Sequence, residues 1–148
     1  MLLGLDILPV IHVIDDDAHS ARLLLGTLAK CGGPGALHLG DENEGLAALR
    51  RCFDDPAAHR PELLVVDIKS HSGAVRDFTK RHGDWLRRNG VQLAVMVPPT
   101  DRSGREEYYE AGADAVFFRQ PELDAYRREM AGIISFWART QRLDAVGM

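Results

Sequence analysis

Short runs of apolar residues alternate along the chain with longer stretches in which apolar residues recur every three or four positions. The short runs are rich in β-branched residues and predict five strands: Val10–Ile14, Ala36–Leu39, Leu63–Val66, Val91–Val97 and Ala115–Phe118. The stretches that follow them predict five helices, of which the one near Arg102–Ala111 is the least apolar. Alternating strands and helices are typical of an α/β protein, in which helices cover both faces of a parallel sheet. We therefore expect a doubly wound sandwich with right-handed crossovers.

Capping residues and helix breakers mark where several of these helices begin and end. Asp17 is placed to cap the first helix, and Gly32–Gly35 ends it. Asp41, followed three positions later by Glu44, predicts a capping box for the second helix. Pro121 is well placed as the first residue of the last helix. These signals agree with the boundaries that the apolar spacing predicts.

Composition and charge indicate one ordinary globular domain. Of the 148 residues, 45% are apolar and 27% are charged, which is enough for one hydrophobic core. We expect a single domain over residues 1–148, with a core from about 10 to 139 and a connector or tail at 140–148. The net charge of −4 argues against direct binding of nucleic acid.

Membrane attachment and disulfide bonds are not expected. No apolar stretch is long enough to span a bilayer, and the first residues lack the basic flank and cleavage site of a signal peptide. The two cysteines, Cys31 and Cys52, have neither a metal-binding spacing nor the density of a disulfide framework. We therefore predict a cytoplasmic protein with free, largely buried thiols.

Acidic residues directly follow two of the predicted strands. Asp15, Asp16 and Asp17 follow the first strand, and Asp67 follows the third. Ligands of an open parallel sheet bind at the carboxyl ends of its strands, so neighbouring strands would bring these carboxylates into one pocket. Such a cluster needs a counter-ion, and carboxylate oxygens suit Mg²⁺. Asp15, Asp16 and Asp67 are therefore predicted to form a weak Mg²⁺ site, whereas Asp17 is expected to cap a helix.

Three segments together resemble the receiver (CheY-like) domain of bacterial response regulators: Ile11–Asp17, Leu63–Asp67 and Glu110–Asp114. The resemblance covers about Val10 to Arg139, nearly the whole chain. It implies a flavodoxin-like (βα)5 fold whose five-stranded parallel sheet has the order 2-1-3-4-5. It also implies a signalling module of a two-component phosphorelay, and not an enzyme.

The resemblance assigns roles to the acidic cluster, residue by residue. Asp67 matches the phosphoacceptor, and Asp15 and Asp16 match the pair that binds Mg²⁺. The backbone carbonyl of Lys69 would be the remaining protein ligand of the ion. The carboxylate of Asp67 would attack a phosphoryl group while Mg²⁺ neutralises charge on the phosphoryl oxygens.

The chain departs from the family pattern where the phosphoryl group is bound and sensed. The family's Ser or Thr at the end of the fourth strand falls on Val97, and its aromatic switch residue falls on Val116. The family's lysine is absent: Arg119 takes its position without a gap, and Gln120 takes it with one inserted residue. Arg119 is expected to contact Asp67 or the phosphoryl group instead, and the non-prolyl Arg119–Gln120 bond is expected to be trans. We therefore expect a degenerate receiver with weakened or absent phosphorylation-driven switching.

Two alternatives to a phosphorylated receiver remain. One is a haloacid-dehalogenase-type phosphotransferase that uses Asp15 and Asp17, and the other is an interaction domain that works without phosphorylation. The partners implied for a receiver are a sensor histidine kinase or a phosphotransfer protein. An output domain, a partner protein or a second copy would bind the surface formed by the last two helices and the strand Ala115–Phe118.

Overall fold

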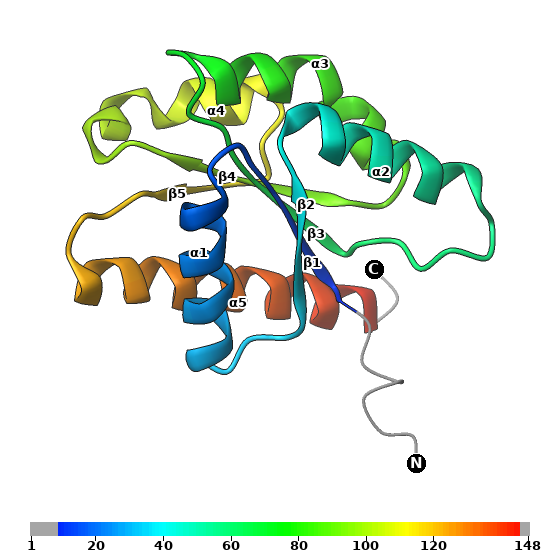
Figure 1. Ribbon diagram of the computed structural model, residues 1–148, viewed down its shortest axis with the longest axis horizontal. Helices are drawn as coiled ribbons and strands as arrows, with labels where there is room; N and C mark the ends of the chain where they lie inside the picture. The colour runs from blue at the N-terminus through cyan, green and yellow to red at the C-terminus, as the bar shows by residue number, and fades with distance from the viewer. Residues whose placement is uncertain (1–8, 146–148) are drawn as a thin grey trace.

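The computed structural model describes residues 9–145, in which strands and helices alternate (Figure 1). Their bounds are β1 Ile11–Asp15, α1 Ala18–Lys30, β2 Ala36–Gly40, α2 Glu42–Asp54, β3 Leu63–Asp67, α3 Ala74–Arg88, β4 Gln92–Val97, α4 Arg105–Ala111, β5 Ala115–Phe118 and α5 Leu123–Ala145. Within residues 9–145 the five strands form one parallel sheet in the order β2-β1-β3-β4-β5. The predicted α/β class and strand order are confirmed.

The helices cover the two faces of the sheet in two groups (Figure 1). On one face, Leu28 of α1 and Met130 of α5 belong to one apolar cluster with strand residues. On the other face, α2 and α3 contribute to a second cluster, which contains Leu49 and Phe78, and Tyr108 of α4 packs against it. Because both faces are covered, every residue of the central strand β3 is buried. This explains why β3 reads as a continuous apolar run instead of an alternating one.

The two helix caps predicted from the sequence are present. The side chain of Asp17 accepts hydrogen bonds from the backbone N–H groups of His19 and Ser20, at 2.9 and 3.2 Å. Asp41 accepts from the N–H of Glu44, and the Glu44 side chain accepts from the N–H of Asp41, both at 2.9 Å. The capping box at the start of α2 is therefore confirmed.

The last helix differs from its prediction at both ends. It begins at Leu123, so the prediction of Pro121 as its first residue is wrong. The backbone N–H of Tyr126 donates to the Glu122 carbonyl, which makes Glu122 the first carbonyl acceptor of the helix. α5 then continues to Ala145, through most of the predicted connector, and residues 146–148 lie outside the described residues. No described helix, α5 included, is long and apolar enough to cross a membrane.

The segment between β4 and β5 begins as a 3₁₀ helix, η2 (Pro99–Gly104), and α4 starts only at Arg105. The prediction of a helix from about Arg102 therefore places its start too early. No described residue of α4 is buried, in agreement with its weak apolar pattern.

Both cysteines are free, as predicted, but they are half-buried and not largely buried. Cys31 is the C-cap residue of α1, and Cys52 lies in the last turn of α2. The Cys52 thiol donates to the backbone carbonyl of His59 at 3.3 Å. Helix ends reach the surface of the sandwich, so these thiols have less cover than the apolar positions in mid-helix.

His12 is a histidine set within strand β1. Its Nδ1 atom is buried and has no hydrogen-bond partner among the groups that the structure describes. Burial, with a smaller contribution from His59, lowers the pKa of His12 from 6.5 to about 4. The unfolded chain therefore binds a proton at His12 more readily than the folded protein does.

Between these two pKa values the unfolded state holds more protons, so the free energy of unfolding decreases as the pH falls through that window. We expect wild-type protein to lose about 1–2 kcal/mol more stability than His12→Gln between about pH 7 and about pH 5. Urea unfolding at both pH values measures this difference. Substitution of the exposed His19 (His19→Gln) should leave the wild-type loss unchanged, whereas equal losses in wild type and His12→Gln would contradict the prediction.

Candidate functional site

The carboxyl ends of β1 and β3 lie side by side in the middle of the sheet, and each strand ends in an aspartate. Asp15 and Asp67 are register partners in the parallel pair. Asp15 is 1% exposed and Asp67 is 2% exposed. The fold therefore holds two carboxylates close together and away from water, which is costly unless cations compensate them.

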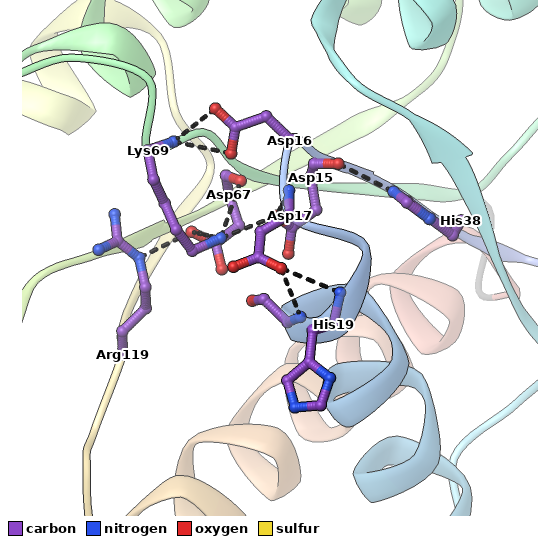
Figure 2. A network of polar contacts seen from close by, with 9 residues as sticks. Asp15, Asp16, Asp17, His19, His38, Asp67, Lys69 and Arg119 are labelled. Carbon is purple, nitrogen blue, oxygen red and sulfur yellow. Dashed lines mark hydrogen bonds and ion pairs between the residues drawn. The ribbon is translucent and has the colours of Figure 1, made fainter.

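The ammonium group of Lys69 contacts both carboxylates (Figure 2). Its Nζ atom is 2.8 Å from Oδ1 of Asp15 and 3.2 Å from Oδ1 of Asp67. It also lies 3.4 Å from the backbone carbonyl oxygen of Asp67. From the sequence, only the backbone carbonyl of Lys69 is expected at the site, so the contacts of its side chain were not predicted.

Asp16, the third carboxylate of the predicted cluster, is exposed and holds the backbone of the loop after β3. The N–H of Lys69 donates to both oxygens of Asp16, at 3.1 and 3.0 Å (Figure 2). The preceding residue, Ile68, is buried in the core. The hydrogen bonds to Asp16 and the burial of Ile68 position the Lys69 backbone beside the site, so the Lys69 side chain can turn back toward the strand ends.

Arg119, the first residue after β5, supplies a second cation. Its Nε atom is 2.7 Å from Oδ1 of Asp67. The backbone N–H of Arg119 donates to the carbonyl of Val97 at 2.8 Å, which extends the pairing of β5 with β4 and holds Arg119 at the sheet edge. Residues 9–145 contain no cis peptide bond, so the prediction of a trans Arg119–Gln120 bond is confirmed. The structure thus brings Arg119 to Asp67, while its contact with a phosphoryl group stays a prediction.

Burial raises the pKa of Asp67, and the charge of Asp15 raises it further, whereas Lys69 and Arg119 oppose this effect. The contacts of Lys69 and Arg119 with Oδ1 of Asp67 are ion pairs that lack the alignment of hydrogen bonds. When all these groups and Asp16 are ionised, the carboxylates of Asp15, Asp16 and Asp67 outnumber the cations Lys69 and Arg119. The site therefore keeps an excess of negative charge and remains able to attract a cation.

Asp17 and His38 support the site without entering the buried cluster. The carboxylate of Asp17 is the cap of α1, while its backbone N–H donates to Oδ1 of Asp15 at 2.8 Å. His38, in the middle of β2, donates through Nε2 to the backbone carbonyl of Asp15 at 2.9 Å (Figure 2). The contact of His38 was not predicted, because the spacing of the histidines along the chain gives none of them a role in the site.

A hollow of about 410 Å³ lies next to the buried cluster. Lys69 and Arg119 line it on the side of the cluster, and Val97 and Thr100 line it on the side of β4 and η2. Val97 is fully buried and carries no hydroxyl group. Tyr108 of α4 closes another side, and its hydroxyl donates to Asp101 at 2.8 Å. Burial, assisted by this hydrogen bond, raises the pKa of Tyr108 to about 12.

Val116 occupies the predicted position of the aromatic switch residue in β5. It is 7% exposed and belongs to the apolar cluster beneath α2 and α3. It does not line the hollow, in which the aromatic residue is Tyr108. A valine at this place packs into the core and has no ring that could turn between an exposed and a buried position.

The donors fit a divalent cation by their chemistry but not by their arrangement. Asp15, Asp16 and Asp67 offer the carboxylate oxygens that Mg²⁺ prefers, and Oδ2 of Asp15 is buried without a hydrogen-bond partner in the described part of the chain. However, no group of three acidic, histidine or cysteine side chains in that part is arranged to hold a metal ion. Asp16 binds the loop backbone, and the Lys69 ammonium contacts the other two carboxylates.

No protein-family model and no curated protein matches the chain by sequence. Solved structures of response regulators, however, superpose on it. The Mn²⁺-bound form of the response regulator Rcp1 gives a TM-score of 0.67 at 20% identity, over 88% of this chain and 94% of that one. The phosphorylated cyanobacterial phytochrome response regulator RcpA gives a TM-score of 0.67 at 21% identity, over 88% and 94% of the two chains.

A response regulator receiver domain from Rhodospirillum rubrum gives a TM-score of 0.65 at 19% identity, over 86% of this chain and 92% of that one. These similarities extend over nearly the whole length of each chain, and the predicted strand order agrees with them. The chain therefore has the fold of a response-regulator receiver domain.

Proposed function

We propose that the chain is a receiver domain of two-component signal transduction, with Asp67 as the phosphoacceptor and with weak phosphorylation-driven switching. The observation that carries the proposal is the position of Asp67. It ends the central strand, is 2% exposed, and lies among Asp15, Lys69 and Arg119 at the carboxyl edge of a receiver-type sheet. Ligands of parallel α/β sheets bind at this edge.

Asp67 has the chemistry of a phosphoryl acceptor. One carboxylate oxygen would attack phosphorus and form an acyl phosphate, while the bond to the donor breaks and its electron pair leaves with the donor group. Arg119, which pairs with Asp67 at 2.7 Å, would turn some of its five donors toward the incoming phosphoryl oxygens. The hollow beside Lys69 and Arg119 gives the donor access from one side.

Weak switching follows from the two valines. A ligand shifts a conformational equilibrium only through its different interactions with the two states. Val97 offers no hydroxyl for a phosphoryl oxygen. Loss of one charge-assisted hydrogen bond reduces the free energy by which phosphorylation favours the active conformation by about 1.5–3 kcal/mol. A shift from mostly inactive to mostly active needs about 5 kcal/mol. Val116 has no ring that could rotate inward. We therefore expect phosphorylation to favour the active conformation by less than these 5 kcal/mol.

The partners proposed for this domain are those of a cytoplasmic signalling module. A sensor histidine kinase or a phosphotransfer protein would donate the phosphoryl group. An output domain or another protein would bind the α4-β5-α5 face, where Tyr109 and Leu123 are 40% and 52% exposed. If phosphorylation does not occur, the same face serves an interaction domain that works without it.

The structure disfavours the phosphotransferase alternative. That function needs the carboxylates of Asp15 and Asp17 on one substrate, but the Asp17 carboxylate accepts the N-terminal N–H groups of α1. Asp15 is buried against Lys69 and pairs in register with Asp67, not with Asp17. We therefore propose a signalling domain and not an enzyme.

We expect acetyl phosphate with Mg²⁺ to label Asp67 poorly, and beryllofluoride with Mg²⁺ to shift only amides near the pocket, because the hydroxyl and the aromatic ring are missing. Intact mass and amide spectra measure the two effects. Labelling should vanish in Asp67→Asn and persist in Asp77→Asn, which changes an exposed carboxylate of α3. Chemical-shift changes spread across α4 and α5 would refute weak switching, and label that survives in Asp67→Asn would refute the acceptor.

We also expect self-association through the α4-β5-α5 face. Tyr109→Glu and Leu123→Glu each place a charge on this face and should weaken a concentration-dependent dimer by about tenfold or more. Leu23→Glu is the matched control, because Leu23 is equally exposed, at 52%, but lies on α1. Light scattering over a range of concentrations gives the result, and a strict monomer at all of them would contradict this prediction.

A further inference from the structure

The Lys69 ammonium has the contacts of a bound cation rather than those of a surface side chain. It faces three oxygens, of which two belong to carboxylates of different strands and one is a backbone carbonyl. The ammonium donates hydrogen bonds to Oδ1 of Asp15 and to the carbonyl oxygen of Asp67, and it forms an ion pair with Oδ1 of Asp67. The side chain is only 28% exposed.

The two carboxylates need this charge. The side chains of Asp15 and Asp67 are 0% and 3% exposed, so water compensates neither of them well. Arg119 reaches Asp67, but among the side chains that the structure describes (residues 9–101 and 104–141) Lys69 is the only cation that contacts a side-chain oxygen of Asp15. Without the ammonium, Asp15 would be a buried carboxylate with no counter-ion, a state that favours uptake of another cation.

The loop is built to deliver the ammonium to this place. The Lys69 backbone is held by both oxygens of Asp16, and the neighbouring Ile68 is buried. A free surface ion pair would restrain only the ends of two side chains and is worth little. Here both the backbone and the ammonium of one residue are held, and both by residues of the same acidic cluster.

We propose that Lys69 is a built-in cation of this site: its ammonium stands between Asp15 and Asp67 where a divalent cation would bind, and metal binding requires the ammonium to leave. With Lys69 in place, a divalent ion would have to share Oδ1 of Asp15 and Oδ1 of Asp67 with the ammonium, which lies 2.8 and 3.2 Å from them, and the two positive charges would repel each other. With Lys69 displaced, the same ion would neutralise the three carboxylates together with Arg119. Binding of the ion and retention of the ammonium therefore exclude each other.

This inference deepens the proposed function and rests on it only for the expectation that the cation is divalent. The test is calorimetric titration of the full chain with Mg²⁺ alone, and with Mn²⁺ alone, without any phosphoryl donor. Lys69→Met and Lys69→Gln keep a long side chain but remove the charge. Both should bind Mg²⁺ at least about tenfold more tightly than wild type, and Lys69→Arg, which keeps a cation, should remain weak.

Thermal unfolding gives a second readout that does not depend on calorimetric heat. Mg²⁺ should raise the melting temperature of Lys69→Met and Lys69→Gln but leave that of wild type almost unchanged, because only a ligand that binds the folded state stabilises it. Lys80→Met, at an exposed lysine of α3, is the matched control and should behave like wild type. Asp15→Asn added to Lys69→Met should abolish the gain.

Two results would overturn the proposal. One is a folded Lys69→Met or Lys69→Gln that binds Mg²⁺ no more tightly than wild type. The other is tight Mg²⁺ binding by wild type that leaves the Lys69 contacts intact. Neither result depends on labelling of Asp67, so failure of phosphorylation would leave this inference standing, and failure of this inference would leave the phosphoacceptor to be tested separately.

Discussion

Two aspartates at the ends of neighbouring parallel strands are the constraint on which the rest of this site depends. The register of β1 with β3 places Asp15 beside Asp67, and the helices on both faces remove them from water. Buried carboxylates this close require opposite charge. The loop after β3 and the end of β5 meet that requirement with Lys69 and Arg119, so the shapes of both segments follow from the electrostatics of the strand ends.

This compensation bears on signalling. A domain that switches must gain interactions in one state that it lacks in the other. Lys69 and Arg119 already contact Asp67 in this structure, and Val97 and Val116 are buried. If Asp67 accepts a phosphoryl group, as we propose, the states with and without it would therefore differ less than in a domain with a hydroxyl and a mobile ring at these two positions. The domain would then present a nearly constant surface to its partners.

Hydrophobic spacing and helix caps are local signals, and they were sufficient for the α/β class and for most of the strands and helices. The strand order 2-1-3-4-5 came from the resemblance to receiver domains. Because that order makes the first and third strands neighbours, and parallel strands end at one edge, Asp15, Asp16 and Asp67 could be placed together. The Lys69 side chain was missed since a pattern of residue types does not tell where a flexible side chain turns; its spacing of two residues from Asp67 was the available signal. The contact of His38 depends on the pairing of β2 with β1, and the start of α5 depends on one backbone hydrogen bond.

The most direct test of charge compensation is the side-chain ¹⁵N spectrum of the ammonium groups. The chain has only three lysines, Lys30, Lys69 and Lys80, so the signals are few. An ammonium held by buried carboxylates exchanges its protons slowly with water, whereas those of exposed lysines exchange fast. One protected signal at neutral pH that disappears in Lys69→Met and shifts in Asp15→Asn is the expected result. A spectrum with no protected ammonium, or one whose protected signal survives Lys69→Met, would contradict the charge compensation described for this site.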